Sequence, residues 1–399
     1  MRDFARRIDS ATPPDRDRAV DALRAMAILG VVLGHWLVTA LVSDSGTVRG
    51  ASPLRYMPEL TPVSWVLQTL AVFFLVGGQV SAKSYASSRA RGVTYGAWLG
   101  ARMARLLRPV AVLVGVWTVV AGVMLASGTN QDTIRALCKL VWSPLWFLLV
   151  FAGLTAATPL VAKLHPLWPL AVVLYVDLFR LGLDGPAWLG WINVPAGWLV
   201  PYCLGTAWAR SALRGRATGW VLLLGGAVVA AGLVLWAGYP ASMVGVPGVP
   251  VSNLDPPSLA VVSFGLAQCG AALLLLGPLR RALRRPAAWA AVALVNLFAM
   301  TVFLWHQTAM IAVTALGLLV GAPLTGLHTV PDSPVWVLAR VAWLPVFALA
   351  LLACWAAFRT YEQGRSRIVA RDTGERVAVA AVTPAPPRTR ARSSTPSAH

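Results

Sequence analysis

An arginine and a histidine in one apolar segment are the first residues whose spacing suggests chemistry. The stretch DALRAMAILGVVLGHW, residues 21–36, contains Asp21, Arg24 and His35. Between Arg24 and His35 an α-helix rises about 16 Å and returns to nearly the same face. Asp21 lies close to that face as well. Because ionisable side chains are costly inside a membrane, this pattern indicates a polar channel along one side of the helix.

Each of these side chains also has a structural interpretation. Arg24, near the cytoplasmic edge, can extend to the headgroups or pair with Asp21. His35 lies at or just past the midplane, where a neutral histidine can be hydrogen-bonded to a neighbouring helix. His306, within the apolar segment VFLWHQTAM, lies equally deep, and a helix–helix hydrogen bond is the alternative to a functional role.

A third feature is a stripe of arginines in the segment 88–109. Arg102, Arg105 and Arg108 recur every three residues, which predicts one stripe on a short helix at the cytoplasmic surface. Arginine forks suit phosphate oxygens, so a phosphorylated donor can dock there. The alternative is ordinary positive charge on the inner side, or contact with anionic lipid.

The elements that position these residues are expected to be membrane helices. The chain is 57% hydrophobic and 12% charged, whereas a soluble domain carries roughly 25% charged residues. We therefore predict an all-α, polytopic membrane protein, with about ten transmembrane helices in one bundle. The apolar runs place these spans near 19–42, 62–82, 109–127, 142–162, 166–181, 187–209, 219–238, 258–279, 293–321 and 335–358.

The basic residues mainly report topology. The net charge of +19 is concentrated in alternate connections, which predicts that both termini are cytoplasmic and argues against a nucleic-acid partner. We expect a cytoplasmic segment at 1–18, a membrane domain at 19–359 that begins with a retained span, and a disordered basic tail at 360–399. The four cysteines lack metal-ligand spacing and are expected to be free thiols.

Several segments together resemble the integral-membrane acyltransferase 3 family. Arg24 and His35 match the signature at the start of the first span, and FLWHQ resembles the family's late Trp-His segment. VFFLVGGQV resembles its FF-hydrophobic-SG-F segment, RMARLLRP its RxxR motif, and SPLWFLLVF its LWFL helix. The order, the spacing and the ten-span plan agree over roughly residues 17–360.

The resemblance implies transfer of an acyl group from cytoplasmic acyl-CoA to a hydroxyl of a sugar, glycan, glycolipid or secreted metabolite. It implies that His35 and Arg24 are catalytic, with His35 as general base, and that Arg102 and Arg105 bind the donor. His306 is expected to bind the acceptor or to orient a neighbour. We expect no bound cofactor and no metal, and a location in the plasma membrane. Both direct transfer and an acyl-histidine intermediate fit.

The sequence departs from the family pattern at two places. Gly77, Gly78 and Gln79 replace the usual Ser-Gly-Phe, which changes the packing expected near the site. The RxxR pair is either Arg102 with Arg105 or Arg105 with Arg108, and we favour the first. A transporter or flippase for a lipid-linked or small metabolite is the main rival interpretation, and a non-catalytic scaffold fits poorly. The acyl chain and the acceptor stay open.

Overall fold

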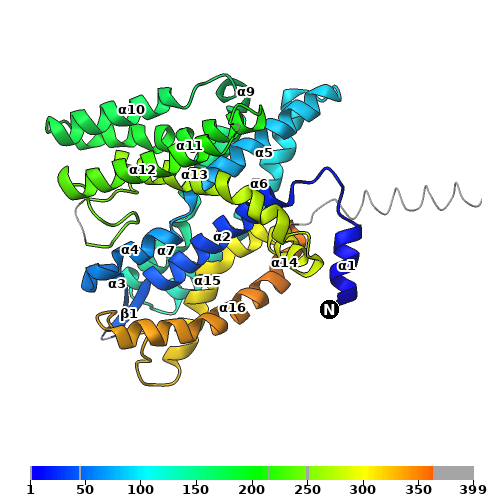
Figure 1. The fold of residues 1–399 in the computed structure, drawn as a ribbon. Helices are drawn as coiled ribbons and strands as arrows, with labels where there is room; N and C mark the ends of the chain where they lie inside the picture. The colour runs from blue at the N-terminus through cyan, green and yellow to red at the C-terminus, as the bar shows by residue number, and fades with distance from the viewer. Residues whose placement is uncertain (1, 45, 214, 249–250, 363–399) are drawn as a thin grey trace, which may run out of the picture.

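The computed structural model describes residues 2–44, 46–213, 215–248 and 251–362. Helices make up most of this part of the chain (Figure 1). Within it, eight helical segments are long and apolar enough to cross a membrane: Arg18–Val38 (α2), Pro58–Ala90 (with α4 and α5), Tyr95–Ala126 (α6), Gln131–Ala156 (α7 and α8), Arg216–Trp236 (α12), Leu259–Ala282 (α13), Ala299–Leu318 (α15) and Pro334–Arg359 (in α16).

The remaining bounds complete the fold. The helices are α1 (Arg2–Ser10), α3 (Pro53–Tyr56), α4 (Thr61–Leu67), α5 (Leu70–Ala90), α7 (Gln131–Trp142), α8 (Leu145–Ala156), α9 (Thr158–Val161), α10 (Leu167–Asp177), α11 (Asn193–Ala209), α14 (Pro286–Leu297) and α16 (Pro334–Glu362). Short turns are η1 (Pro58–Leu60), η2 (Leu178–Gly182) and η3 (Ala187–Ile192), and the strands are β1 (Ala40–Asp44) and β2 (Thr47–Ala51).

The ten predicted spans all fall on helices, but two of these helices are short. The ranges 166–181 and 187–209 contain α10, with 11 residues, and α11, with 17. A helix that crosses the hydrocarbon core alone needs about 20 residues. The structure thus supports a polytopic helical membrane protein, while ten spans and cytoplasmic termini stay predictions. Most of the predicted tail, from residue 363 onward, lies outside the described residues.

The arginine stripe does not lie on a short separate helix, and that prediction was wrong. Helix α6 runs without a break from Tyr95 to Ala126, with Pro109 inside it. It begins where the Thr94 side chain accepts a hydrogen bond from Ala97 N at 3.3 Å. Proline is tolerated here because membrane helices can satisfy the freed carbonyl through their surroundings. The stripe and the apolar span are therefore one rigid element.

A β-hairpin that the apolar pattern did not predict follows α2 directly. β1 pairs antiparallel with β2 in a register that places Ala40 opposite Ala51. Gly46 adopts a φ of 81° in its turn, a conformation that favours glycine. Val48 N donates to Thr133 Oγ1 of α7 at 3.0 Å. The hairpin thereby covers the end of α2 and ties it to α7.

Two glycines allow α5 and α11 to cross closely. A Cβ on Gly78 would lie 2.2 Å from the carbonyl oxygen of Tyr202, and one on Gly205 would lie 2.0 Å from that of Leu75. Any larger residue at either position would separate the helices. The glycines thus permit the backbone contact that small residues provide in membrane bundles. Gly78 stands where the family pattern also has glycine, so the departures at Gly77 and Gln79 leave this close approach intact.

Helices α2 and α15 lie side by side within the largest group of buried apolar side chains. In Figure 1, α10 to α13 gather on one side of the molecule, and α2, α15 and α16 lie on the other. Aromatic rings from four other helices belong to this group, namely Phe74, Trp117, Phe147 and Trp198, together with Phe303 of α15 itself. This cluster places residues far apart in sequence around His35.

Candidate active site

The structure brings the two predicted histidines together. The ring centroids of His35, on α2, and His306, on α15, are 5.1 Å apart, and the planes meet at 43°. The His35 side chain is half-buried, whereas His306 is completely buried. His35 thus keeps some exposed surface, whereas the adjacent His306 has none.

The hydrogen bond made by His306 defines its tautomer. Nδ1 of His306 lies 2.5 Å from the carbonyl oxygen of Phe303. Because a carbonyl can only accept, Nδ1 carries the hydrogen and Nε2 keeps its lone pair. Among the described residues, Nε2 has no hydrogen-bond partner. A buried imidazole whose Nε2 has no partner in the described residues thus lies beside the His35 ring.

Arg24 is held by polar neighbours and does not contact His35. Its Nε donates to Asn296 Oδ1, and its Nη2 lies 3.4 Å from Asp21 Oδ1. Asn296 Nδ2 donates to the Asp21 carbonyl oxygen at 2.7 Å, and Arg16 pairs with the other Asp21 oxygen at 2.6 Å. The structural alternative for Arg24, an ion pair with Asp21, is therefore present.

These contacts show how α2 is aligned with its neighbours. Arg24 meets Asn296 near one end of α2, and His35 meets His306 further along. Asn296 is the penultimate residue of α14, and α15 starts two residues after α14 ends. The segment from α14 into α15 thus runs parallel to α2. The shared face of Arg24 and His35, inferred from spacing, is the face that this segment covers.

The arginines of α6 approach Arg24. Arg102 is half-buried, with its Cζ 5.6 Å from the centroid of the Trp98 ring, while Arg105 is exposed. Arg24 is close enough to both for their like charges to interact unfavourably. In the described part of the chain, neither Arg102 nor Arg105 belongs to an ion pair. An anion bound here would relieve this repulsion.

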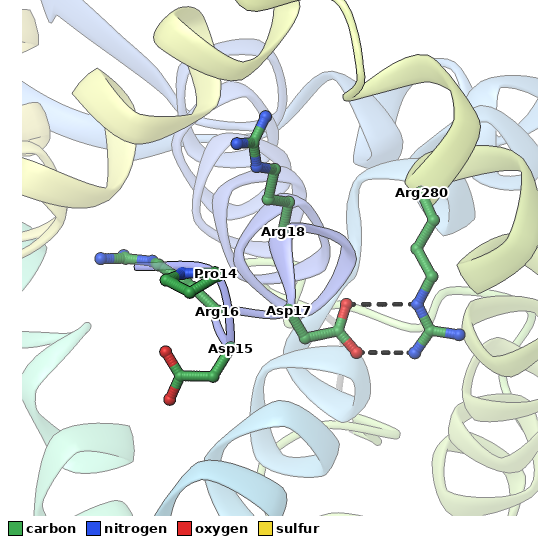
Figure 2. Close-up of a pocket in the computed structure, with 6 residues that line it drawn as sticks. All are labelled: Pro14, Asp15, Arg16, Asp17, Arg18 and Arg280. Carbon is green, nitrogen blue, oxygen red and sulfur yellow. Dashed lines mark hydrogen bonds and ion pairs between the residues drawn. The ribbon is translucent and has the colours of Figure 1, made fainter. Parts of the chain in front are cut away.

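A second basic region lies at the start of α2, but its arginines have carboxylate partners. A cavity of about 330 Å³ is lined by Pro14, Asp15, Arg16, Asp17, Arg18 and Arg280 (Figure 2). Arg280 donates to both oxygens of Asp17, at 2.6 and 3.3 Å, and Arg18 pairs with Asp9 at 2.6 Å. Because these charges are already compensated, the cavity suits an anion less well than Arg102 and Arg105 do.

One residue with no predicted role joins the histidine pair to the rest of the site. The indole nitrogen of Trp36 donates to the carbonyl oxygen of His306 at 2.9 Å. Trp36 is buried and follows His35 in the sequence. Its position beside His35 is the only sequence signal that would have suggested it. The bond fixes α2 against α15 at the level of the two imidazoles.

Fold and site together define a multi-pass membrane protein with two adjacent histidines inside it and, at one end of the same bundle, arginines that have no ion-pair partner among the described residues. A family model described as an acyltransferase domain, that of acyltransferase 3, matches residues 17–359. The chain therefore belongs to the acyltransferase 3 family, as its motifs suggested. Comparison with curated proteins and with solved structures finds no match.

Proposed function

We propose that this membrane acyltransferase moves an acyl group from acyl-CoA to a hydroxyl of a sugar, glycan, glycolipid or secreted metabolite. The observation that carries the proposal is the pair of His35 and His306 within the acyltransferase domain. An imidazole with exposed surface, beside a second imidazole, is the kind of side chain that can accept and return a proton during acyl transfer.

In the proposed reaction His35 is the general base. The acceptor oxygen attacks the thioester carbonyl carbon while an imidazole nitrogen of His35 takes the hydroxyl proton. The carbon–sulfur bond then breaks, and the leaving thiolate of CoA receives that proton from His35. In this proposal the Nε2 lone pair of His306, whose ring centroid is 5.1 Å from that of His35, stabilises the imidazolium form of His35 between these steps. An acyl-histidine intermediate would use the same residue as nucleophile.

The donor's charged nucleotide is proposed to bind at Arg102 and Arg105. Both guanidinium groups are free of carboxylates within the described residues, and arginine pairs with phosphate oxygens through two parallel hydrogen bonds. Arg24 lies between this end and His35 on α2, so it would line the path of the uncharged pantetheine arm. Its hydrogen bonds to Asp21 and Asn296 would hold the Arg24 side chain in position beside that path.

The proposal also fixes an orientation in the plasma membrane. The arginine end faces the cytoplasm, with both chain termini, because acyl-CoA is a cytoplasmic donor. Cysteine labelling at Val251 and Arg284, both exposed, tests this. Labelling of Val251→Cys from outside intact cells, with Arg284→Cys protected until the membrane is opened, is the expected result. Labelling of both from the same side would contradict the topology.

Mass spectrometry tests the function. Membranes and secreted metabolites from cells with and without this protein should differ by one species whose mass exceeds that of its precursor by an acyl group. This difference would also name the acyl chain and the acceptor. If the protein changes only on which side of the membrane a metabolite accumulates, and no mass changes, the protein is a transporter and the proposal fails.

A further inference from the structure

A buried arginine on α16 binds the end of the helix that carries His35. Arg340 is 1% exposed. Its Nε donates to the carbonyl oxygen of Trp36 at 2.6 Å, its Nη2 to that of Thr39 at 2.7 Å, and its Nη1 to that of Gly326 at 2.8 Å. Nη2 also contacts the sulfur of Met310 on α15. One guanidinium group thus joins α2, α15, α16 and the connection before α16.

Two of these acceptors, the carbonyl oxygens of Trp36 and Thr39, lie at the end of α2, where a helix leaves carbonyl groups without partners. Helix α2 ends at Val38, and the last carbonyl groups of a helix have no amide of their own to accept from. Arg340 donates hydrogen bonds to two carbonyl oxygens at this end of α2, those of Trp36 and Thr39. Its positive charge lies at the negative end of the helix dipole. The guanidinium of arginine presents separate nitrogens in one plane to these carbonyls, a geometry that the single ammonium nitrogen of lysine does not reproduce.

The same contacts reach both histidines. Trp36, whose carbonyl binds Arg340, follows His35 directly and donates its indole N–H to His306. Met310 lies one helical turn after His306. The ring of Phe347 completes the arrangement, 5.5 Å from the Trp36 ring and 4.7 Å below the Arg340 guanidinium carbon. Moving Arg340 would therefore move α2 and α15 relative to each other.

A purely space-filling role explains this arrangement poorly. Burying a guanidinium group is costly, and no carboxylate in the described residues pairs with Arg340. An apolar side chain would fill the same space without that cost. The planar set of hydrogen bonds is what an apolar residue cannot supply, and those bonds end on the backbone that places the two imidazoles.

We infer that Arg340, acting through Trp36, is a positioning residue that sets the separation and orientation of His35 and His306. This inference rests on the proposed function of His35 as the base. Arg340 itself contacts neither substrate. Since small displacements of catalytic groups lower the rate about 100-fold, loss of the guanidinium bonds should slow the chemical step and leave donor binding unchanged.

The first test is kinetic and uses Arg340→Lys, which keeps the charge and loses the fork. We expect kcat to fall about 10- to 100-fold, with the KM for acyl-CoA close to that of the wild type, both measured at a temperature where the variant is folded. Arg359→Gln is the matched control, because Arg359 lies on the same helix and also stacks on a tryptophan, Trp355, at 4.9 Å, but is exposed. Arg359→Gln should leave both kcat and the KM for acyl-CoA unchanged.

The second test does not depend on activity. The chain has five histidines, so selective ¹³C labelling of histidine rings gives few NMR signals in detergent. Arg340→Lys should shift the signals of His35 and His306 and leave that of exposed His165 unchanged, and Arg359→Gln should shift none of these. Unchanged His35 and His306 signals, or a normal kcat in Arg340→Lys, would overturn the inference.

Trp36→Phe decides the matter if Arg340→Lys does not fold. It keeps an aromatic ring at this position and removes the N–H that binds His306, together with the five-membered ring that carries it. A lower kcat with shifted His35 and His306 signals supports the inference, and wild-type values for both overturn it. Failure of the proposed function would look different, because the wild-type protein would then transfer no acyl group while the NMR shifts could still be measured.

Discussion

The two ends of α2 are held by opposite kinds of contact. At the start, Asp17 and Asp21 pair with arginines that are partly open to water, such as Arg280, whose side chain is 54% exposed. At the other end Arg340 is buried and bonded only to carbonyl oxygens and a sulfur. Arg102 and Arg105, which belong to no ion pair in the described residues, approach Arg24 near this end and suit the binding of a charged donor. Buried bonds to the backbone fix geometry, so the other end suits the reacting groups.

The largest effect predicted at the charged end concerns donor binding. The double substitution Arg102→Ala with Arg105→Ala should raise the KM for acyl-CoA and leave that for the acceptor nearly unchanged. A charge-assisted contact contributes roughly 1.5–3 kcal/mol when desolvated and less in water. With Arg102 half-buried and Arg105 exposed, we expect a rise of about 10- to 100-fold. Equal effects on both substrates would indicate a structural role. Arg108→Ala, also exposed on α6, is the control and should have a smaller effect.

The next prediction tests the buried end. His306→Gln keeps polarity and approximate size. If His306 orients His35 and is not itself the base, part of the activity should remain, with kcat about one tenth of the wild-type value or somewhat less. Steady-state kinetics on purified, folded protein measures this. Complete loss in a variant with a normal Tm would give His306 the primary catalytic role and reverse the ranking of the two histidines.

A smaller effect is expected from Asp21→Asn. It removes the ion pairs with Arg16 and Arg24 but can keep the hydrogen-bond geometry at the site. Such partly exposed pairs contribute only about 0–1 kcal/mol, so kcat/KM for acyl-CoA should fall less than about fivefold. A loss as large as that of the arginine pair would show that the Asp21 charge itself takes part in the reaction, and the contrast between the ends of α2 would fail.

The smallest effect concerns stability and pH at Asp17. Partial burial raises the pKa of Asp17, but the Arg280 charge and the hydrogen bond from Ala19 N outweigh it, so this pKa is lower than usual. A carboxyl whose pKa is depressed on folding stabilises above its unfolded pKa and loses that contribution as pH falls through the folded value. Asp17→Asn should therefore lower Tm slightly at pH 7, by an amount that corresponds to about 1 kcal/mol or less, and the difference in Tm should shrink as the pH falls below the unfolded pKa of the carboxyl. A difference between the two proteins that does not shrink on acidification would contradict this.

The sequence predicted the helical membrane fold because each long apolar run must satisfy its backbone internally. It missed the β-hairpin after α2, whose strands have five residues each, because so short a signal has no clear periodicity. It placed a helix start at Pro109, where α6 continues, because proline usually ends helices in water. What decides this case is the surrounding bundle, which a local pattern does not contain.

The site was predicted in its parts but not in its connections. Spacing alone placed Arg24 and His35 on one face of a helix. That His306 would meet His35 depends on which helices pack together, and the period of 3.6 residues identifies an apolar face without naming its partner. Arg340 was visible as a charged residue within the predicted span 335–358, a signal of function in a membrane helix. The sequence alone indicates no role for Arg340, because two of its acceptors are backbone groups of residues about 300 positions earlier in the chain.

The central claim is that His35 is the general base. The measurement is acyl transfer by purified His35→Ala protein in liposomes, beside a direct assay of acyl-CoA binding. The account predicts a loss of at least about 10²- to 10⁴-fold in kcat, with folding and acyl-CoA binding close to those of the wild type, since one imidazole is a small part of the bundle. Near-normal turnover by His35→Ala would contradict the assignment.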